Sequence, residues 1–370
     1  MDTNKYKHIF IIVFQLYITV TMAQYNNIIS FKESGNNQKI ISPEISLYNS
    51  TNKFIELEYH FENASVINKK NNDVIYQHIN IKDFNHMGEI GNPSIPSHID
   101  VIALPNGAVA QISIEETEYI EYTDFNIYPT LEAACDSIGS PEPAFVINQE
   151  QYSKNEFYPE ELVEEVEFQK MREAGLAFIE IRPIQFNPIT RTIRVYSKIK
   201  YKINYSGAVN TFKDLAINNS INYLKTLNNV SINDNVIPNK PNNNTTNNKS
   251  INSNYIIITH PEYSKAAKAL AKWKMQLGYQ VEIISKSNWT TNEIKDSISL
   301  KYNNYSPKPD YVLFLGNISK VPSEIKYYQG NSAYATDLYY VCMNGANDYI
   351  ADISKGRISV EDSTEAFNTI

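Results

Sequence analysis

The sequence predicts two structured regions of different class: a β-rich, sandwich-like region over residues 24–232 and an α/β region with a mostly parallel sheet over residues 255–370. In the first region apolar and polar residues alternate, as in strands that bury one face. In the second region strand-like runs alternate with helical patterns, as in a parallel sheet with crossover helices. Residues 233–254 are Asn-rich and contain almost nothing that could be buried, which predicts a linker.

The clearest strand in the first region covers residues 192–205, where Ile, Val and Tyr share one face and Arg, Lys and Asn share the other. Residues 55–61 alternate in the same way. Further β-type runs, separated by turn residues such as those of Gly91-Asn92-Pro93, are residues 74–81, 99–104, 111–114 and 178–186. Short strands with such punctuation favour a sandwich or a related antiparallel fold. Residues 160–174 are the exception, because their pattern predicts an amphipathic helix.

In the second region strands are predicted at residues 255–259, 280–284 and 310–315. The first helix follows Pro261 and ends before Gly278, and the second begins with a capping box of Thr290 and Glu293. Residues 338–342 and 349–353 predict a hairpin or an edge pair, and residues 363–370 the first turns of another helix. We therefore expect an incomplete α/β unit, because the strands that would finish a ligand site at the carboxyl ends of the sheet would lie beyond Ile370.

The composition narrows the function classes. The chain has 370 residues, a net charge of −8 and no evident basic stripe, so a nucleic-acid partner is not expected. The two cysteines, Cys135 and Cys342, lie in different predicted regions, which argues against a disulfide framework. No stretch after the amino terminus is apolar enough for a stable membrane span.

Residues 1–23 match a secretory signal peptide. Lys5 and Lys7 precede an apolar core at residues 9–20, and small residues stand before a cut between Ala23 and Gln24. A transmembrane anchor is the alternative, but the apolar run is shorter than the roughly 20 residues that a bilayer core demands. The pattern therefore predicts a secreted or extracellular protein, with attachment at the cell surface left open.

Few residues suggest chemistry directly. The histidines have no metal-ligand spacing, no zinc signature is present and no glycine loop could cradle a phosphate. His260 and Cys342 are the only Cys–His pair in the second region, although the run around Cys342 is more simply explained as strand packing. Asp337, Asp348 and Asp352 surround a Gly-containing turn and are candidate calcium ligands, with solvated turn acids as the alternative. No cofactor is required.

Several short segments occur in an order that resembles the gingipain family of secreted cysteine peptidases. In the first region they are GNPSIP at residues 91–96, IALPNGA at 102–108, FYP at 157–159 and RPIQFNP at 182–188. In the second region they are YIIIT at 255–259, YVLFLG at 311–316, TDLY at 336–339 and GRIS at 356–359. The first region is similar to the family's propeptide, and the α/β region resembles the opening of its peptidase domain.

The resemblance implies a caspase-like α/β sheet and a catalytic His and Cys, with thiolate attack on a peptide carbonyl. In the family both residues follow the segment that GRIS resembles, so the dyad is expected beyond Ile370. We assign no catalytic residue in this chain and reject His260 and Cys342 as substitutes. The implied partners are protein or peptide substrates of the complete enzyme and, for an inhibitory or chaperoning propeptide, its own peptidase domain.

Two other functions stay open. One is a naturally short, non-catalytic secreted protein that binds or inhibits a partner through its β-rich region. The other is a sortase-like relative that trims exported proteins. The Asn-rich linker also predicts propeptide processing around Lys240 or Lys249, which would free the α/β region.

Overall fold

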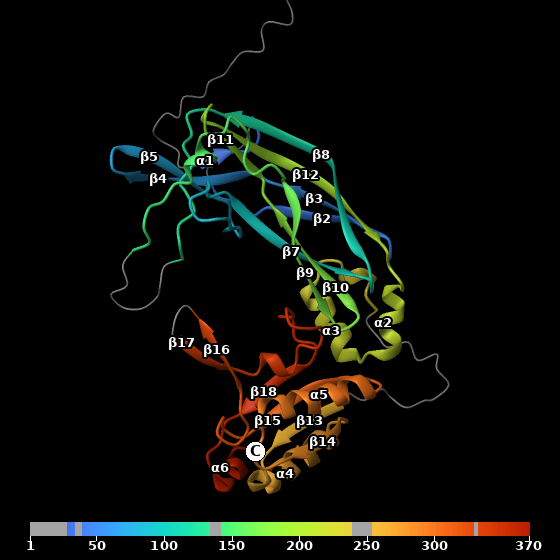
Figure 1. The fold of residues 1–370 in the computed structure, drawn as a ribbon. Helices are drawn as coiled ribbons and strands as arrows, with labels where there is room; N and C mark the ends of the chain where they lie inside the picture. The colour runs from blue at the N-terminus through green and yellow to red at the C-terminus, as the bar shows by residue number, and fades with distance from the viewer. Residues whose placement is uncertain (1–27, 34–38, 134–141, 239–253, 329–331) are drawn as a thin grey trace, which may run out of the picture.

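The computed structural model describes residues 28–33, 39–133, 142–238, 254–328 and 332–370. The predicted signal peptide, Cys135, Lys240 and Lys249 lie outside the described residues. Figure 1 shows the β-rich region, coloured blue to yellow-green, above the α/β region, coloured orange to red.

The β-rich region consists of antiparallel sheets in the order β1-β4-β5, β6-β7-β10-β9 and β11-β12-β3-β2, with β8 paired to the other edge of β12. The strands are β1 Ile28–Ser30, β2 Glu44–Ser50, β3 Phe54–His60, β4 Asn63–Asn71, β5 Val74–Asn80, β6 Asn85–His86, β7 Pro96–Leu104, β8 Val109–Tyr122, β9 Val163–Met171, β10 Ala174–Ile181, β11 Ile184–Asn187 and β12 Thr192–Ser206. The short helices are α1 Gln149–Tyr152, α2 Phe212–Asn218 and α3 Ile221–Val230, followed by the 3-10 turn Asp234–Val236.

Strand β12 organises this region, and its predicted faces are confirmed. Its side chains Val195, Ile199 and Tyr201 are fully buried. On the other face, Lys198 and Lys202 form ion pairs with glutamates of the neighbouring strands. One continuous hydrophobic core takes side chains from β3, β7, β10 and β12, which confirms the β-rich, sandwich-like class.

The predicted helix over residues 160–174 is wrong. Residues Val163–Met171 form β9, which pairs antiparallel with β10. The glutamates of this segment favour a helix in isolation, but β10 is almost entirely buried and needs a partner for its main-chain groups. Tertiary pairing therefore overrides the local preference and leaves β9 as an edge strand of its sheet.

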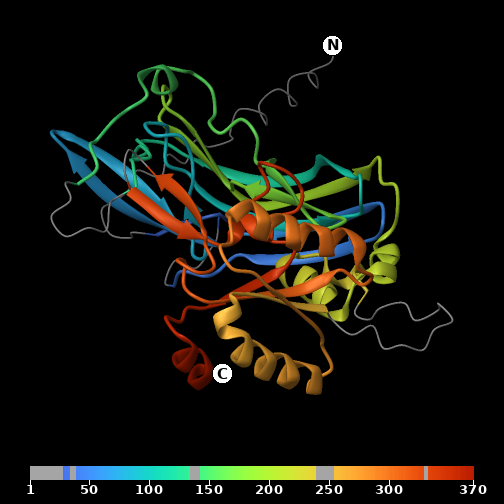
Figure 2. The ribbon, with the colours of Figure 1, turned by 60° about the horizontal axis from the view of Figure 1, so that its bottom comes forward.

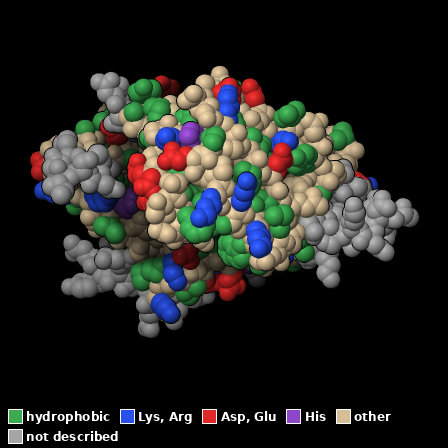
Figure 3. Space-filling view, turned by 90° about the horizontal axis from the view of Figure 1, so that it is seen from below, with side chains coloured by type: hydrophobic (Ala, Val, Ile, Leu, Met, Phe, Trp, Pro, Cys, Tyr) green, Lys and Arg blue, Asp and Glu red, His purple; other side chains and the backbone are tan. Residues whose placement is uncertain are grey.

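The α/β region contains a parallel sheet in the order β14-β13-β15-β18, as predicted for a mostly parallel sheet. Helices α4 and α5 cover its two faces: α4 packs on Ile257 and Leu313, and α5 packs on Ile256 and Val312 (Figure 2). The elements are β13 Asn254–Thr259, α4 Ser264–Gln276, β14 Gln280–Ser285, α5 Thr291–Asn304, β15 Pro309–Leu315, β18 Ser354–Ile358 and α6 Ser363–Thr369, with 3-10 turns Pro261–Tyr263 and Leu338–Tyr340 and a separate hairpin of β16 Glu324–Tyr328 and β17 Ser332–Thr336. Figure 3 shows the molecule from the side of the α/β region, where charged and hydrophobic side chains are interspersed.

The predicted hairpin of residues 338–342 and 349–353 is also wrong. Residues Leu338–Tyr340 form a 3-10 turn, and the edge strand of the sheet is β18, parallel to β15. Tyr340 packs against Phe314 with ring centroids 5.2 Å apart, so this segment closes over the sheet face instead of extending along its edge. Within the described residues no helix combines the length and apolar character needed to cross a membrane.

The capping box at the start of α5 is confirmed. The Thr290 hydroxyl accepts from Glu293 N at 3.3 Å, and the Glu293 carboxylate accepts from Thr290 N at 3.0 Å. We expect Thr290→Ala to lower the free energy of unfolding by about 1 kcal/mol, because the first turn loses an acceptor. Urea unfolding followed by the fluorescence of the neighbouring, buried Trp289 measures this, and an unchanged midpoint would contradict it.

Candidate functional site

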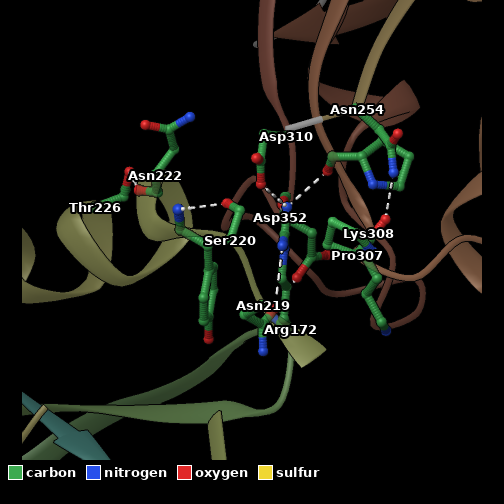
Figure 4. A network of polar contacts seen from close by, with 12 residues as sticks. Arg172, Asn219, Ser220, Asn222, Thr226, Asn254, Pro307, Lys308, Asp310 and Asp352 are labelled. Carbon is green, nitrogen blue, oxygen red and sulfur yellow. Dashed lines mark hydrogen bonds and ion pairs between the residues drawn. The ribbon is translucent and has the colours of Figure 1, made fainter. Parts of the chain in front are cut away.

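The candidate site is a contact between the two regions at the tip of the β9–β10 hairpin. Arg172 lies in this turn with a φ of 54°, and the residue is only 5% exposed. Its side chain points away from the β-rich sheets toward Asp310 and Asp352 of the α/β region (Figure 4). We call Arg172 and its partners Asp310, Asp352, Asn219 and Tyr223 the Arg172 clasp.

On the α/β side, the Arg172 guanidinium binds the beginning of β15. Its Nη2 donates to Asp310 Oδ1 at 3.0 Å and to the Pro309 carbonyl at 2.6 Å. Its Nε donates to the Asp352 carbonyl at 3.0 Å. The main-chain N–H of Arg172 also donates to the Asp352 carboxylate. The hairpin tip is thereby held by both its main chain and its side chain.

On the side of the β-rich region, α2 and α3 support the same arginine. Asn219, between these helices, accepts from Arg172 Nη1 at 3.0 Å. The Tyr223 ring lies 4.7 Å from the guanidinium carbon, and its hydroxyl donates to the Met171 carbonyl at 2.7 Å. The helices therefore fix the hairpin tip in the conformation that presents Arg172.

A second ion pair lies beside the clasp. Glu173 is the next residue of the turn, and its Oε1 lies 3.0 Å from Nζ of Lys308, which directly precedes β15. Asn219 donates to the Glu173 carboxylate at 3.1 Å. Both charged side chains of this pair are about a quarter exposed, so it contributes orientation more than binding energy.

The clasp buries its charges. The Arg172 and Asp310 side chains are 1% and 4% exposed. Loss of either partner would leave the other charge buried and uncompensated, which is strongly destabilising. Asp310 Oδ2 has no hydrogen-bond partner within the described chain, and a cavity of about 240 Å³ adjoins it. Burial raises the pKa of Asp352 to about 6, although N–H groups of Arg172 and Met343 donate to its carboxylate.

The clasp lies at the amino edge of the parallel sheet, where β15 begins. At the opposite, carboxyl edge, a different arginine organises the loops. The Arg357 guanidinium forms two hydrogen bonds with Asp337, of 2.7 and 2.8 Å, and donates to the carbonyls of Gly316 and Val321 at 2.8 Å each. Open α/β sheets bind their ligands at this carboxyl edge.

The three candidate calcium ligands each accept hydrogen bonds from protein groups, and Asn344 donates to both Asp348 and Asp352. Asp337 binds Arg357, Asp348 accepts from the main-chain N–H groups of Asn344 and Ile350, and Asp352 belongs to the clasp. No group of three or more His, Cys, Asp or Glu side chains in the described part of the chain could hold a metal ion. Calcium binding therefore stays a prediction without support from this geometry.

His260 and Cys342 each have a structural role. His260 Nδ1 accepts from the main-chain N–H of Glu262 at 3.2 Å and caps the turn that precedes α4. Cys342 is buried and follows the 3-10 turn Leu338–Tyr340, so its expected place in a strand is wrong. Burial raises the pKa of its thiol to about 12, which disfavours the thiolate that nucleophilic attack requires.

Sequence reasoning missed Arg172. The residue falls inside the segment predicted as a helix, where it resembles one more solvated charge. One feature of the sequence could have indicated its position: Arg172 and Glu173 separate two β-type runs, at residues 163–171 and 174–181. Because β10 is a buried strand, a two-residue turn between it and β9 would have singled out Arg172 and Glu173 as candidate contact residues.

Two family models match the chain. The model for the C25 propeptide matches residues 36–235, and the model for peptidase family C25 matches residues 248–370. The chain therefore belongs to the C25 family, as a gingipain-family propeptide followed by the opening of the peptidase domain.

The curated relatives are gingipains of Porphyromonas gingivalis. Lys-gingipain is 23% identical over 299 residues, covering 76% of this chain and 17% of the relative. Gingipain R2 is 20% identical over 326 residues, covering 86% of this chain and 43% of the relative. The chain thus spans about a sixth of the first relative and less than half of the second.

Similar solved structures include the complex of P. gingivalis RgpB pro- and mature domains, with 18% identity and a TM-score of 0.44 over 52% of this chain and 99% of that chain. A structure describing the zymogenic latency of gingipain K from the same organism has 20% identity and a TM-score of 0.41 over 49% of this chain and 98% of that chain.

Proposed function

We propose that this chain forms the propeptide and the first part of the peptidase domain of a cysteine endopeptidase precursor that hydrolyses peptide bonds by Cys–His catalysis. The family membership of both regions supports this proposal. The described residues include no catalytic dyad that we can assign, so the proposal of Cys–His catalysis rests on family membership alone.

Within this precursor, the role of the β-rich region is to bind the α/β region through the Arg172 clasp. The single observation that carries this role is the buried pair of Arg172 and Asp310, which joins residues 138 positions apart in the chain. Separation of the regions would leave both charges without their partner. The clasp therefore favours one specific docked arrangement.

The position of the clasp suggests how docking helps. Pro309 and Asp310 begin β15, a central strand of the parallel sheet, so the contact stabilises the sheet at its amino edge. This supports a chaperoning contribution, in which the propeptide holds the first strands of the peptidase domain in place. The clasp lies at the opposite edge from the carboxyl edge, where we expect the catalytic site of the family. Inhibition of that site would therefore depend on contacts other than the clasp.

We also propose that the precursor is exported through the signal peptide at residues 1–23 and is processed in the Asn-rich linker. The pattern of basic, apolar and small residues before Gln24 supports export. Processing at Lys240 or Lys249 would cut the chain between the β-rich region and the α/β region. The two regions would then be held together by non-covalent contacts, which include the clasp.

Limited trypsin digestion of the full chain tests the docking role. We expect the first cut in the linker, after which the two fragments still elute together in size-exclusion chromatography at neutral pH. The same digestion of Arg172→Ala should give fragments that separate. Arg191→Ala, which truncates an exposed arginine of the β-rich region, is the matched control and should elute as the wild type does. Separation of the wild-type fragments, or co-elution of the Arg172→Ala fragments, would refute the role.

A further inference from the structure

Two histidines of the propeptide lie face to face, far in sequence from the Arg172 clasp. The rings of His78 on β5 and His86 on β6 have centroids 4.2 Å apart and an interplanar angle of 24°. At this separation two imidazolium rings would repel each other strongly. The stack therefore favours a state in which at least one ring is neutral.

The polar contacts of His86 are compatible with a neutral ring, although hydrogen bonds with Ser94 and Ile79 act to raise its pKa. His86 Nε2 is 3.0 Å from Asn80 Oδ1, and His86 Nδ1 is 2.9 Å from Ser94 Oγ. This arrangement fits one N–H donor and one acceptor nitrogen on His86. His78 Nδ1 is buried and has no hydrogen-bond partner within the described chain, so an added proton there would create a buried N–H without an acceptor.

The charges around the stack disfavour protonation as well. Lys69 on β4 acts on both rings. The carboxylates Asp83 and Asp100 act on His98, whose pKa they raise, and not on the two stacked rings. Burial, His86 and Lys69 lower the pKa of His78 to about 4, and burial and Lys69 lower the pKa of His86.

The stack lies where separate segments of the propeptide meet. Ser94, the partner of His86, donates its main-chain N–H to the Tyr128 carbonyl at 2.8 Å. Gln77, next to His78, is joined to the same segment by hydrogen bonds with Asn126 and Tyr128, of 2.7 and 2.9 Å. A change at the stack therefore reaches β5, β6 and the segment that contains residues 126–128.

We propose that the His78–His86 stack is an acid-sensitive joint of the propeptide, which opens when a ring takes up a proton. The pKa of His78 is lowered on folding, so its neutral form stabilises the fold fully above pH 6.5, and this stability is lost progressively as the pH falls toward 4. Acidification would loosen β5 and β6 first. The stack and its hydrogen-bond partners all belong to the propeptide, and none of them is a residue of the Arg172 clasp.

Hydrogen–deuterium exchange of the full chain, measured by mass spectrometry on peptides from residues 74–86 and corrected for the intrinsic effect of pH, tests the joint. Between pH 7 and pH 5 the wild-type protection factor of this segment should fall by up to about 20-fold, from the difference between a pKa of 6.5 and one of about 4. His78→Phe retains a stacking ring and should remove most of this fall. An equal fall in both proteins, or none in the wild type, would overturn the proposal.

Two further variants separate the joint from other titrations. Lys69→Gln removes the neighbouring cation and should reduce the fall even if His78→Phe does not fold. His98→Phe removes a histidine whose pKa is raised by Asp100, so its acid loosening should be as large as that of the wild type or larger. A Lys69→Gln variant that loosens as much as the wild type, or a His98→Phe variant that resists acid, would contradict the assignment.

Discussion

Arg172→Ala should lower the free energy of unfolding of the α/β region by about 3–5 kcal/mol, because removing one partner from a buried ion pair costs this much. The substitution leaves Asp310 buried without a cation and removes the donors to the Pro309 and Asp352 carbonyls. Both tryptophans of the chain, Trp273 and Trp289, lie in the α/β region. Their fluorescence during urea unfolding of the full chain therefore reports the loss.

The controls distinguish docking from a general loss of stability. Arg172→Lys retains the positive charge but cannot make the separate bonds of Nε, Nη1 and Nη2, so its effect should be intermediate. Arg191→Ala should change the transition by less than about 0.5 kcal/mol, as exposed substitutions usually do. If Arg172→Ala also fell within that range, the clasp would not hold the two regions together.

Arg357→Met should have the second largest effect, a loss of about 2–3 kcal/mol in the free energy of unfolding. Hydrogen bonds to charged groups are worth about 1.5–3 kcal/mol each, but the side chains of Arg357 and Asp337 are partly exposed, so water replaces part of what the four bonds contribute. The variant leaves Asp337 without its bidentate partner and frees the carbonyls of Gly316 and Val321. Exchange protection across residues 316–323 should fall with it, and the carboxyl edge of the sheet should loosen.

The pH dependence of Arg357→Met provides its control. Burial acts to raise the pKa of Asp337, but bonds from Arg357 and Ser323 outweigh it and hold the pKa below the ordinary value of 3.8. A lowered pKa contributes stability above pH 3.8 that is lost as the pH falls through the folded value. Arg357→Met should lose this acid-sensitive component. A variant with wild-type stability and wild-type pH dependence would contradict the role of Arg357.

Much of the fold could be predicted because its elements follow a burial pattern. Strands β12, β13 and β15 and the capping box of α5 all show in the local sequence, since their side chains meet either core or solvent in a fixed period. Strand β9 could not be predicted, because its partner β10 overrides the helix preference of its glutamates.

The Arg172 clasp could not be predicted for a different reason. Asp310 and Asp352 lie 138 and 180 positions from Arg172, and the local pattern around each resembles an ordinary strand or turn. Only the folded arrangement of the hairpin, α2–α3 and β15 brings their charges together. From the sequence, Asp352 is a candidate calcium ligand. In the structure, its carboxylate accepts a hydrogen bond from the main-chain N–H of Arg172 at the hairpin tip.

The coupling energy between Arg172 and Asp310 tests the docked arrangement most directly. A double-mutant cycle of Arg172→Ala, Asp310→Ala and the double variant, measured by urea unfolding of the full chain, isolates this energy because the two residues contact each other only in the docked state. We expect a coupling of at least about 1.5 kcal/mol, with the double variant much less destabilised than the sum of the single ones. Additive effects within about 0.3 kcal/mol would show that the pair does not form, and would contradict the binding of the propeptide to the α/β region through the Arg172 clasp.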